Sequence, residues 1–196
     1  MPLDALPQFI HQHYELHEWR HASAILERDF PGEWEDIVDV LSRFRLCQSY
    51  ITTPGGRKSA VSNWIDSSLF DKGWRETDFK TAVVVDDRKT DSPTHSVDCF
   101  KNKIAVEIEW NNKDPFYDRD LNNFRLLFEL RVISVGVIIT RCDHLQKIFD
   151  SLGRGKSYGS STTHMSKLLP KIEGGGGGGC PVLVFGIKES LYDTNC

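Results

Sequence analysis

The chain has 196 residues, of which 39% are hydrophobic and 27% charged, so it can bury one substantial core of an ordinary globular protein. No apolar run approaches the roughly 20 residues that span a bilayer, and the N-terminal residues lack the features of a signal peptide. The net charge of -4 argues against a protein that coats nucleic acid by bulk charge, although it leaves room for a local basic cleft.

The five cysteines are scattered along the chain and never form a C-x-x-C pair. This spacing predicts neither a disulfide framework nor a zinc site, and it fits a reducing cytoplasm. The residues concerned are Cys47, Cys99, Cys142, Cys180 and Cys196.

The N-terminal part is predicted to be helical. Between residues 7 and 46 apolar side chains recur at helical spacing, most clearly Trp34, Ile37, Val38, Leu41 and Phe44. A loop is expected at residues 53–56, and a further helix from Ala60 to Phe70. Because glycines before a helix N-terminus can hold a phosphate, Lys58 is a candidate for contact with a DNA backbone, but the spacing is not that of a P-loop.

Residues 81–85 are predicted to form a short strand, and residues 86–93 a solvated loop. A β-hairpin with its tip at residues 101–103 follows. In that register Asp98 lies opposite Glu107, and the two-residue period of a strand puts Glu107 and Glu109 on one face. The other face is apolar and is expected to point into the core, through Ile104, Val106, Ile108 and Trp110.

Three carboxylates therefore converge on one face of this hairpin. Like charges directly opposed in a sheet destabilise it, by up to about 1 kcal/mol per exposed pair, and a bound cation reverses that sign. All-oxygen ligation suits a hard ion, which favours Mg²⁺ over Zn²⁺. The alternative is that Glu107 and Glu109 simply form the wet face of a half-buried strand.

The following segments are predicted to complete a mixed sheet. Asp118 or Asp120 can cap a helix, and residues 133–140 read as a strand buried on both faces. This order of strand, helix and strand indicates a crossover connection. Residues 181–187 read as a last strand, and residues 188–196 as a frayed end.

Residues 151–171 are the basic segment of the chain and contain no acidic residue. Hydroxyl residues and glycines make this segment suitable as a loop that approaches a polar surface closely. A disordered surface loop is the alternative. The six glycines at residues 174–179 are predicted to be a flexible tether.

The segment from Asp98 through Glu107-x-Glu109 to Leu121 resembles the BglII/BstYI family of type II restriction endonucleases. The resemblance continues through the strand ending at Thr140 and residues 158–164, and it is weaker in the helical first half. It implies an α/β fold with a mixed central sheet flanked by helices and a PD-(D/E)xK nuclease core.

By this resemblance the chain is one endonuclease domain over residues 1–196. Residues 1–75 would be its mainly helical part, and residues 76–196 its catalytic sheet core. A recognition loop would lie at about residues 151–171.

The resemblance also implies roles for single residues. Asp98, Glu107 and Glu109 would be catalytic, and Mg²⁺ would be bound by Asp98, Glu107 and the backbone carbonyl of Ile108. Glu109 stands where many such nucleases have a lysine, and it could be a general base or a second metal ligand. The residues expected to contact DNA are Lys58, Asn112, Lys113, Ser151, Arg154, Lys156, Ser157, Tyr158 and Ser160.

The implied activity is Mg²⁺-dependent hydrolysis of double-stranded DNA at a short palindrome, one that contains GATC and is cut to leave a 5′ overhang. A homodimer, a bacterial cytoplasm and a DNA methyltransferase in the same host are implied with it. Three alternatives stay open. They are a repair-type nuclease of the same fold, a catalytically degenerate DNA-binding protein and, most remotely, a glycosidase with a carboxylate pair.

Overall fold

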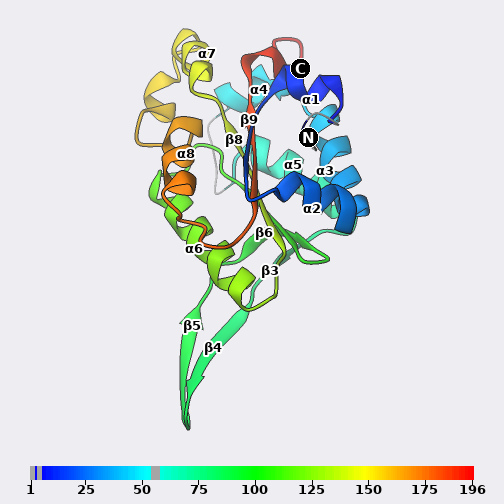
Figure 1. The fold of residues 1–196 in the computed structure, drawn as a ribbon. Coiled ribbons are helices and arrows are strands. Elements are labelled where there is room, and N and C mark those ends of the chain that lie inside the picture. Colours follow the sequence, from blue (N-terminus) through cyan, green and yellow to red (C-terminus); the bar gives the residue numbers. More distant parts are fainter. Residues whose placement is uncertain (1–2, 4–5, 54–57) are drawn as a thin grey trace.

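The structure is a computed structural model that describes residue 3, residues 6–53 and residues 58–196. A six-stranded mixed sheet runs through the body of the molecule, with helices on both faces (Figure 1). Its central strands β7, β8 and β9 are parallel, and the outer strands pair antiparallel. The predicted fold class is therefore confirmed. In order across the sheet the strands are β1 (Tyr14–Trp19), β9 (Val182–Ile187), β8 (Val135–Arg141), β7 (Ile104–Ile108), β6 (Val97–Lys101) and β3 (Arg75–Thr77).

The sheet separates two apolar cores. The N-terminal helices cover one face, against Val106 and Ile108 of β7, and Phe149 of α7 packs into the same core, whereas α6 and α8 cover the other face, against Ala105. None of the described helices is long and apolar enough to cross a membrane. The helices are α1 (Gln8–His13), α2 (Ala22–Asp29), α3 (Pro31–Arg43), α4 (Gln48–Thr52), α5 (Ala60–Phe70), α6 (Pro115–Glu129), α7 (Gln146–Ser151) and α8 (Met165–Glu173), with short 3-10 helices η2 (Asp143–Leu145), η3 (Gly155–Tyr158) and η4 (Glu189–Leu191).

The hairpin of β6 and β7 forms as predicted. Cys99 pairs with Val106, and Asn102 and Lys103 make the turn with positive φ angles of 43° and 70°. Continuing that register by one residue brings Asp98 beside Glu107. The α5 helix also begins and ends where the sequence predicts.

Residues 14–19 form a strand, β1, and not part of the predicted helical region. β1 pairs along its whole length with β9, from Tyr14 opposite Ile187 to Trp19 opposite Val182. The apolar spacing around Tyr14 is compatible with a helix. The strand is the more stable structure here because it forms ladder hydrogen bonds with β9, a segment far along the chain. The local apolar pattern contains no information about this partner.

A two-stranded ribbon projects from the body between β3 and β6 (Figure 1). It consists of β4 (Lys80–Val85) and β5 (Arg88–Pro93), joined at Asp86, which has a φ of 50°. The predicted strand at residues 81–85 is confirmed. The predicted loop is wrong for residues 88–93, because only the tight turn between the two strands is irregular.

The C-terminal part is more ordered than the sequence predicts. The glycine tract turns back on itself through hydrogen bonds such as Gly176 N–H to the Lys171 carbonyl, at 2.8 Å, so it is no flexible tether. The end of the chain is not frayed, because β10 (Tyr192–Asp193) pairs with β2 (Leu46–Cys47). Cys47 and Cys196 form a disulfide there, contrary to the expectation from cysteine spacing.

The basic segment is likewise not a loop throughout. η3 and α8 occupy much of residues 151–171, and they are joined by residues 159–164. The loop expected at residues 53–56 lies, from residue 54 onward, outside the described residues.

Candidate active site

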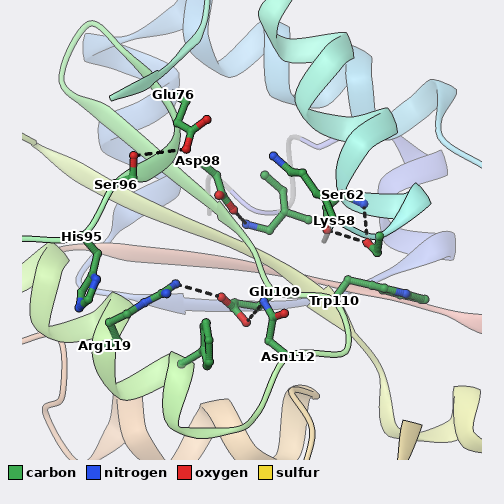
Figure 2. Close-up of a pocket in the computed structure, with 13 residues that line it drawn as sticks. Lys58, Ser62, Glu76, His95, Ser96, Asp98, Glu109, Trp110, Asn112 and Arg119 are labelled. Atoms are coloured by element: carbon green, nitrogen blue, oxygen red, sulfur yellow. Dashed lines mark hydrogen bonds and ion pairs between the residues drawn. The ribbon is translucent and has the colours of Figure 1, made fainter. Parts of the chain in front are cut away.

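A cavity of about 720 Å³ opens beside the β6–β7 hairpin. Four parts of the chain form its walls: the segment that enters α5, strand β3 through Glu76, the β6–β7 hairpin with the residues that flank it, and the first turns of α6 (Figure 2). Its lining residues include Lys58, Asp98, Glu109, Asn112 and Arg119. Several of the residues that the sequence singles out for chemistry therefore line one cavity.

Asp98 and Glu107 lie side by side on the adjacent hairpin strands. The Ile108 N–H donates to Asp98 Oδ2 at 3.0 Å, and the Asp98 N–H approaches Glu107 Oε2 at 3.4 Å. Glu107 is only 1% exposed, and its Oε1 has no hydrogen-bond partner among the described residues. A buried carboxylate oxygen without a donor is costly, so Glu107 is not the wet face of a strand.

Glu109 is held from two sides. Asn112 Nδ2 donates to Glu109 Oε2 at 2.8 Å, and Arg119 Nη2 lies 3.6 Å from Oε1 (Figure 2). The Glu109 carbonyl accepts from the Thr140 hydroxyl of β8 at 2.9 Å. The side chain is thus fixed at the cavity wall.

Asp120 is a fourth carboxylate at this site, and the sequence reasoning missed its role. α6 begins at Pro115, which suits the first helical position, so Asp120 lies inside the helix and does not cap it. Asp118 lies in the first turn and is not the cap either. By its spacing, Asp120 lies on the same helix face as Phe124 and Leu127. A carboxylate within that apolar stripe is the feature of the sequence that could have indicated an inward-facing functional residue.

Burial and the repulsion between neighbouring carboxylates raise the pKa values of Glu107, Glu109 and Asp120. Desolvation raises the pKa of Glu107 well above its ordinary value, and Asp120, Asp98 and Glu109 add to the shift. The pKa of Glu109 is raised to about 9, first by burial and then by Asp120, while Arg119 opposes the shift. The charged forms therefore need a compensating cation.

The donors at this site suit a hard divalent cation. Among the residues that the structure describes, no three His, Cys, Asp or Glu side chains stand in a ready metal-binding group. Glu107 Oε1 has no partner among the described residues, while its Oε2 accepts from the Asp98 N–H, and carboxylate oxygens are the ligands that such ions prefer.

Lys58 reaches the cavity from the segment before α5. Its ammonium group is ion-paired with the buried Asp66, which also accepts from the Cys99 Sγ at 3.4 Å. Burial lowers the pKa of Lys58, but the Asp66 carboxylate outweighs burial, so the net pKa is raised. The lysine stays positively charged beside the carboxylates.

The structure brings Asn112 and Lys113 together with the predicted recognition loop at residues 151–171. Lys113 forms an isolated bridge with Thr162, and the Thr163 N–H donates to the Asn112 carbonyl at 2.9 Å. Buried Arg141 supports this junction, because its Nη2 donates to the Thr162 hydroxyl at 2.9 Å. The sequence did not single out Arg141, which reads locally as the end of a strand.

The other predicted DNA contacts differ in exposure. Ser151, Lys156, Ser157 and Ser160 are exposed, and Arg154 is half-buried. Tyr158 is 5% exposed and stacks on Phe149 at a centroid distance of 4.0 Å, so its ring belongs to the core.

Comparison with known families points to one of them. The family model for the restriction endonuclease BglII/BglIII matches residues 14–187. These are the first residue of β1 and the last residue of β9, so the match spans the whole six-stranded sheet. A search of curated proteins found no significant match.

Proposed function

The chain belongs to the restriction endonuclease BglII/BglIII family and is therefore a type II site-specific deoxyribonuclease, in which we propose that Asp98, Glu107 and Glu109 are catalytic. The observation that carries this assignment is the buried Glu107 carboxylate, which has one oxygen without a partner among the described residues and neighbours Asp98, a residue that lines the cavity. We propose Mg²⁺ as the metal ion, held by Asp98, Glu107 and the Ile108 carbonyl. All are oxygen donors, as this ion prefers.

When bound, the ion would polarise the scissile phosphate and lower the pKa of a water molecule. Glu109 then orients the attacking water or accepts its proton, because the Asn112 amide holds its carboxylate at the cavity wall. Lys58 neutralises charge on a DNA phosphate that enters the cavity. Lys113 is a further candidate for a phosphate contact.

We assign sequence recognition to Asn112 and the predicted recognition loop at residues 151–171, which meet at the junction described above. Asn112 would contact a base through its Oδ1, because its Nδ2 is engaged by Glu109. In the predicted recognition loop, the longest exposed donor is Lys156. Arg154 nearby is half-buried, and Ser151, Ser157 and Ser160 are shorter donors. Tyr158 acts through packing and not through a DNA contact.

We further propose a single endonuclease domain over residues 1–196, acting as a homodimer on a palindrome. A two-fold symmetric DNA site is matched by a two-fold symmetric protein. The site would contain GATC and be cut to leave a 5′ overhang, and a methyltransferase in the host would protect it. These finer statements rest on the family resemblance.

The substitution Glu107→Ala tests the catalytic assignment. Cleavage of double-stranded DNA in Mg²⁺ should be lost, because a metal ligand is removed, while DNA binding stays within about tenfold, because a negative charge near phosphate is removed too. Cleavage is measured on plasmid DNA with an EDTA control, and binding by fluorescence anisotropy.

Glu129→Ala is the matched control, since Glu129 is an exposed glutamate at the far end of α6. It should cut like the parent. Cleavage by Glu107→Ala at the parent's rate would remove Glu107 from the metal site.

A further inference from the structure

Arg119 extends from α6 into the cavity and is held there by its own helix (Figure 2). Its Nε donates to Asp120 Oδ1 at 2.9 Å, and its Nη2 is ion-paired with the same oxygen at 2.8 Å. Its guanidinium carbon lies 4.3 Å from the centre of the Phe116 ring. Neighbouring residues on a helix ordinarily point apart, so the guanidinium reaches this place by folding back over Asp120.

The cavity needs such a cation. A DNA phosphate that enters it meets the carboxylates of Asp98 and Glu109 at the wall, with Glu107 and Asp120 behind them. Each like charge repels the phosphate, and the low dielectric of a part-buried site strengthens the repulsion. A divalent ion compensates the carboxylates that bind it, but the phosphate also needs donors of its own.

Resting on the proposed function of this cavity, we propose that Arg119 is a further catalytic residue, which binds the scissile phosphate through the guanidinium edge not used by Asp120. Asp120 is then its positioning residue. The contacts to Asp120 use the edge of Nε and Nη2. They leave the edge formed by Nη1 and the second N–H of Nη2 for the phosphate, with Glu109 Oε1 3.6 Å from Nη2. With 30% of its side chain exposed, Arg119 is reachable from the cavity yet already ordered, so little conformational entropy is lost on binding.

Arg119 suits this role better than Lys58, the lysine among the described residues that line the cavity. Lys58 presents one nitrogen, which is ion-paired with Asp66. A guanidinium has a planar fork of donors that matches two oxygens of a phosphate, whereas an ammonium group is a point charge. Lys58 can therefore attract a phosphate, and Arg119 can also orient it.

A cycle that combines protein and DNA changes tests the contact. The ends of the fragments cut by the parent give the scissile phosphate, and a duplex is made with a neutral methylphosphonate at that position. Binding is measured in EDTA as a function of salt. Arg119→Ala should weaken binding to the ordinary duplex about tenfold and lower the salt slope by about 0.9. On the methylphosphonate duplex, Arg119→Ala and the parent should bind equally.

Single-turnover cleavage in Mg²⁺ gives the second readout. Arg119→Ala should cut the ordinary duplex about a hundredfold more slowly than the parent, as when one transition-state donor is lost. Arg125→Ala is the matched control, because Arg125 is an exposed arginine on the same helix that bonds Asn122 outside the cavity. It should bind and cut like the parent.

Loss of the same binding affinity on both duplexes, or cleavage by Arg119→Ala at the parent's rate, would overturn the proposal. If Arg119→Ala does not fold, Arg119→Lys replaces it, since it keeps a charge beside Asp120 but lacks the fork. It should melt like the parent and cut about tenfold more slowly, and an unchanged rate would overturn the assignment. A parent that neither binds nor cuts DNA would instead refute the proposed function, and this inference with it.

Discussion

At the scale of single residues, the candidate site contains buried carboxylates next to a cavity, and their ionised forms are energetically unfavourable. Glu107 and Glu109 are each 1% exposed and face further carboxylates, so their ionised forms lack the water that would stabilise them. Burial of this kind is destabilising unless a cation or a proton compensates it. The free energy of unfolding of the metal-free protein should therefore depend on pH and on divalent cations.

Glu109 gives the clearest pH prediction. Its pKa in the folded protein is raised to about 9 by burial and Asp120, above its ordinary value of 4.5. The protonated form is thus favoured by folding, and this contribution to stability is complete below about pH 4.5 and lost as the pH rises through about 9. In EDTA, Glu109→Gln should become more stable than the parent as the pH rises, as measured by urea unfolding between pH 5 and 9.

Mg²⁺ should act in the same direction as a proton. It should raise the melting temperature of the parent in the absence of DNA, and more at pH 8 than at pH 5, because the carboxylates must be ionised to bind it. Parallel stability curves for the parent and Glu109→Gln, with no effect of Mg²⁺ at either pH, would contradict this description of the site.

The sequence predicts that Asp98, Glu107 and Glu109 lie together, because a hairpin register and a two-residue period are local properties. It does not predict that Arg119 and Asp120 lie at the same site, because their positions depend on where α6 begins and on which face of α6 packs on the sheet. An acidic pair after Pro115 reads equally well as a helix cap or a solvated turn. Only the apolar stripe of α6 marks Asp120 as an inward residue.

At the scale of elements, the site depends on how closely α6 packs on the central strands. Gly136 of β8 lies directly under Phe124 of α6, and a Cβ at this glycine would overlap the phenyl ring. β8 pairs with β7 on one side and β9 on the other. A shift of α6 at this point would carry Asp120 and Arg119 with it.

The substitution Gly136→Ala should therefore destabilise the protein by about 1 to 3 kcal/mol through overpacking, as measured by urea unfolding. Gly32→Ala is the control, since nothing lies within 4 Å of a Cβ at this exposed position of α3. It should raise stability by about 0.4 to 1 kcal/mol, because alanine has less conformational freedom in the unfolded chain. Equal stability of both variants would refute the close packing of α6 on β8.

Elements whose pattern is local were predictable, and elements that depend on distant partners were not. Helix α5 and the buried strand β8 follow from periodicity and apolar runs. Strand β1 requires β9, some 170 residues later, and β10 requires β2. The turns of residues 174–179 could not be predicted either, because a run of identical residues has no pattern. These glycines are ordered by their packing against α6.

At the scale of the whole molecule, the C-terminal residues are tied to a segment far back in the sequence. Cys196 is bonded to Cys47 across a sequence separation of 149 residues, beside the small parallel pair of β10 and β2. A cross-link over so long a loop restricts the unfolded chain strongly. Cysteine spacing in the sequence contains no information on this proximity.

Cys196→Ser should lower the free energy of unfolding by about 2 to 4 kcal/mol when parent and variant are compared without reductant. With excess dithiothreitol the parent should fall to the stability of the variant. Urea unfolding under both conditions measures this, and a parent whose stability exceeds that of the variant equally with and without reductant would contradict the disulfide.

The central claim is that this chain cuts DNA at a specific site through a divalent cation held by Asp98 and Glu107. The most direct test is digestion of a long, fully sequenced, unmethylated DNA in Mg²⁺ and in EDTA, followed by sequencing of the fragment ends. The account predicts discrete ends that share one short palindrome in Mg²⁺, and no cleavage in EDTA. A smear without common ends would indicate a repair-type nuclease, and binding without cleavage would indicate a degenerate site; either result would contradict the claim.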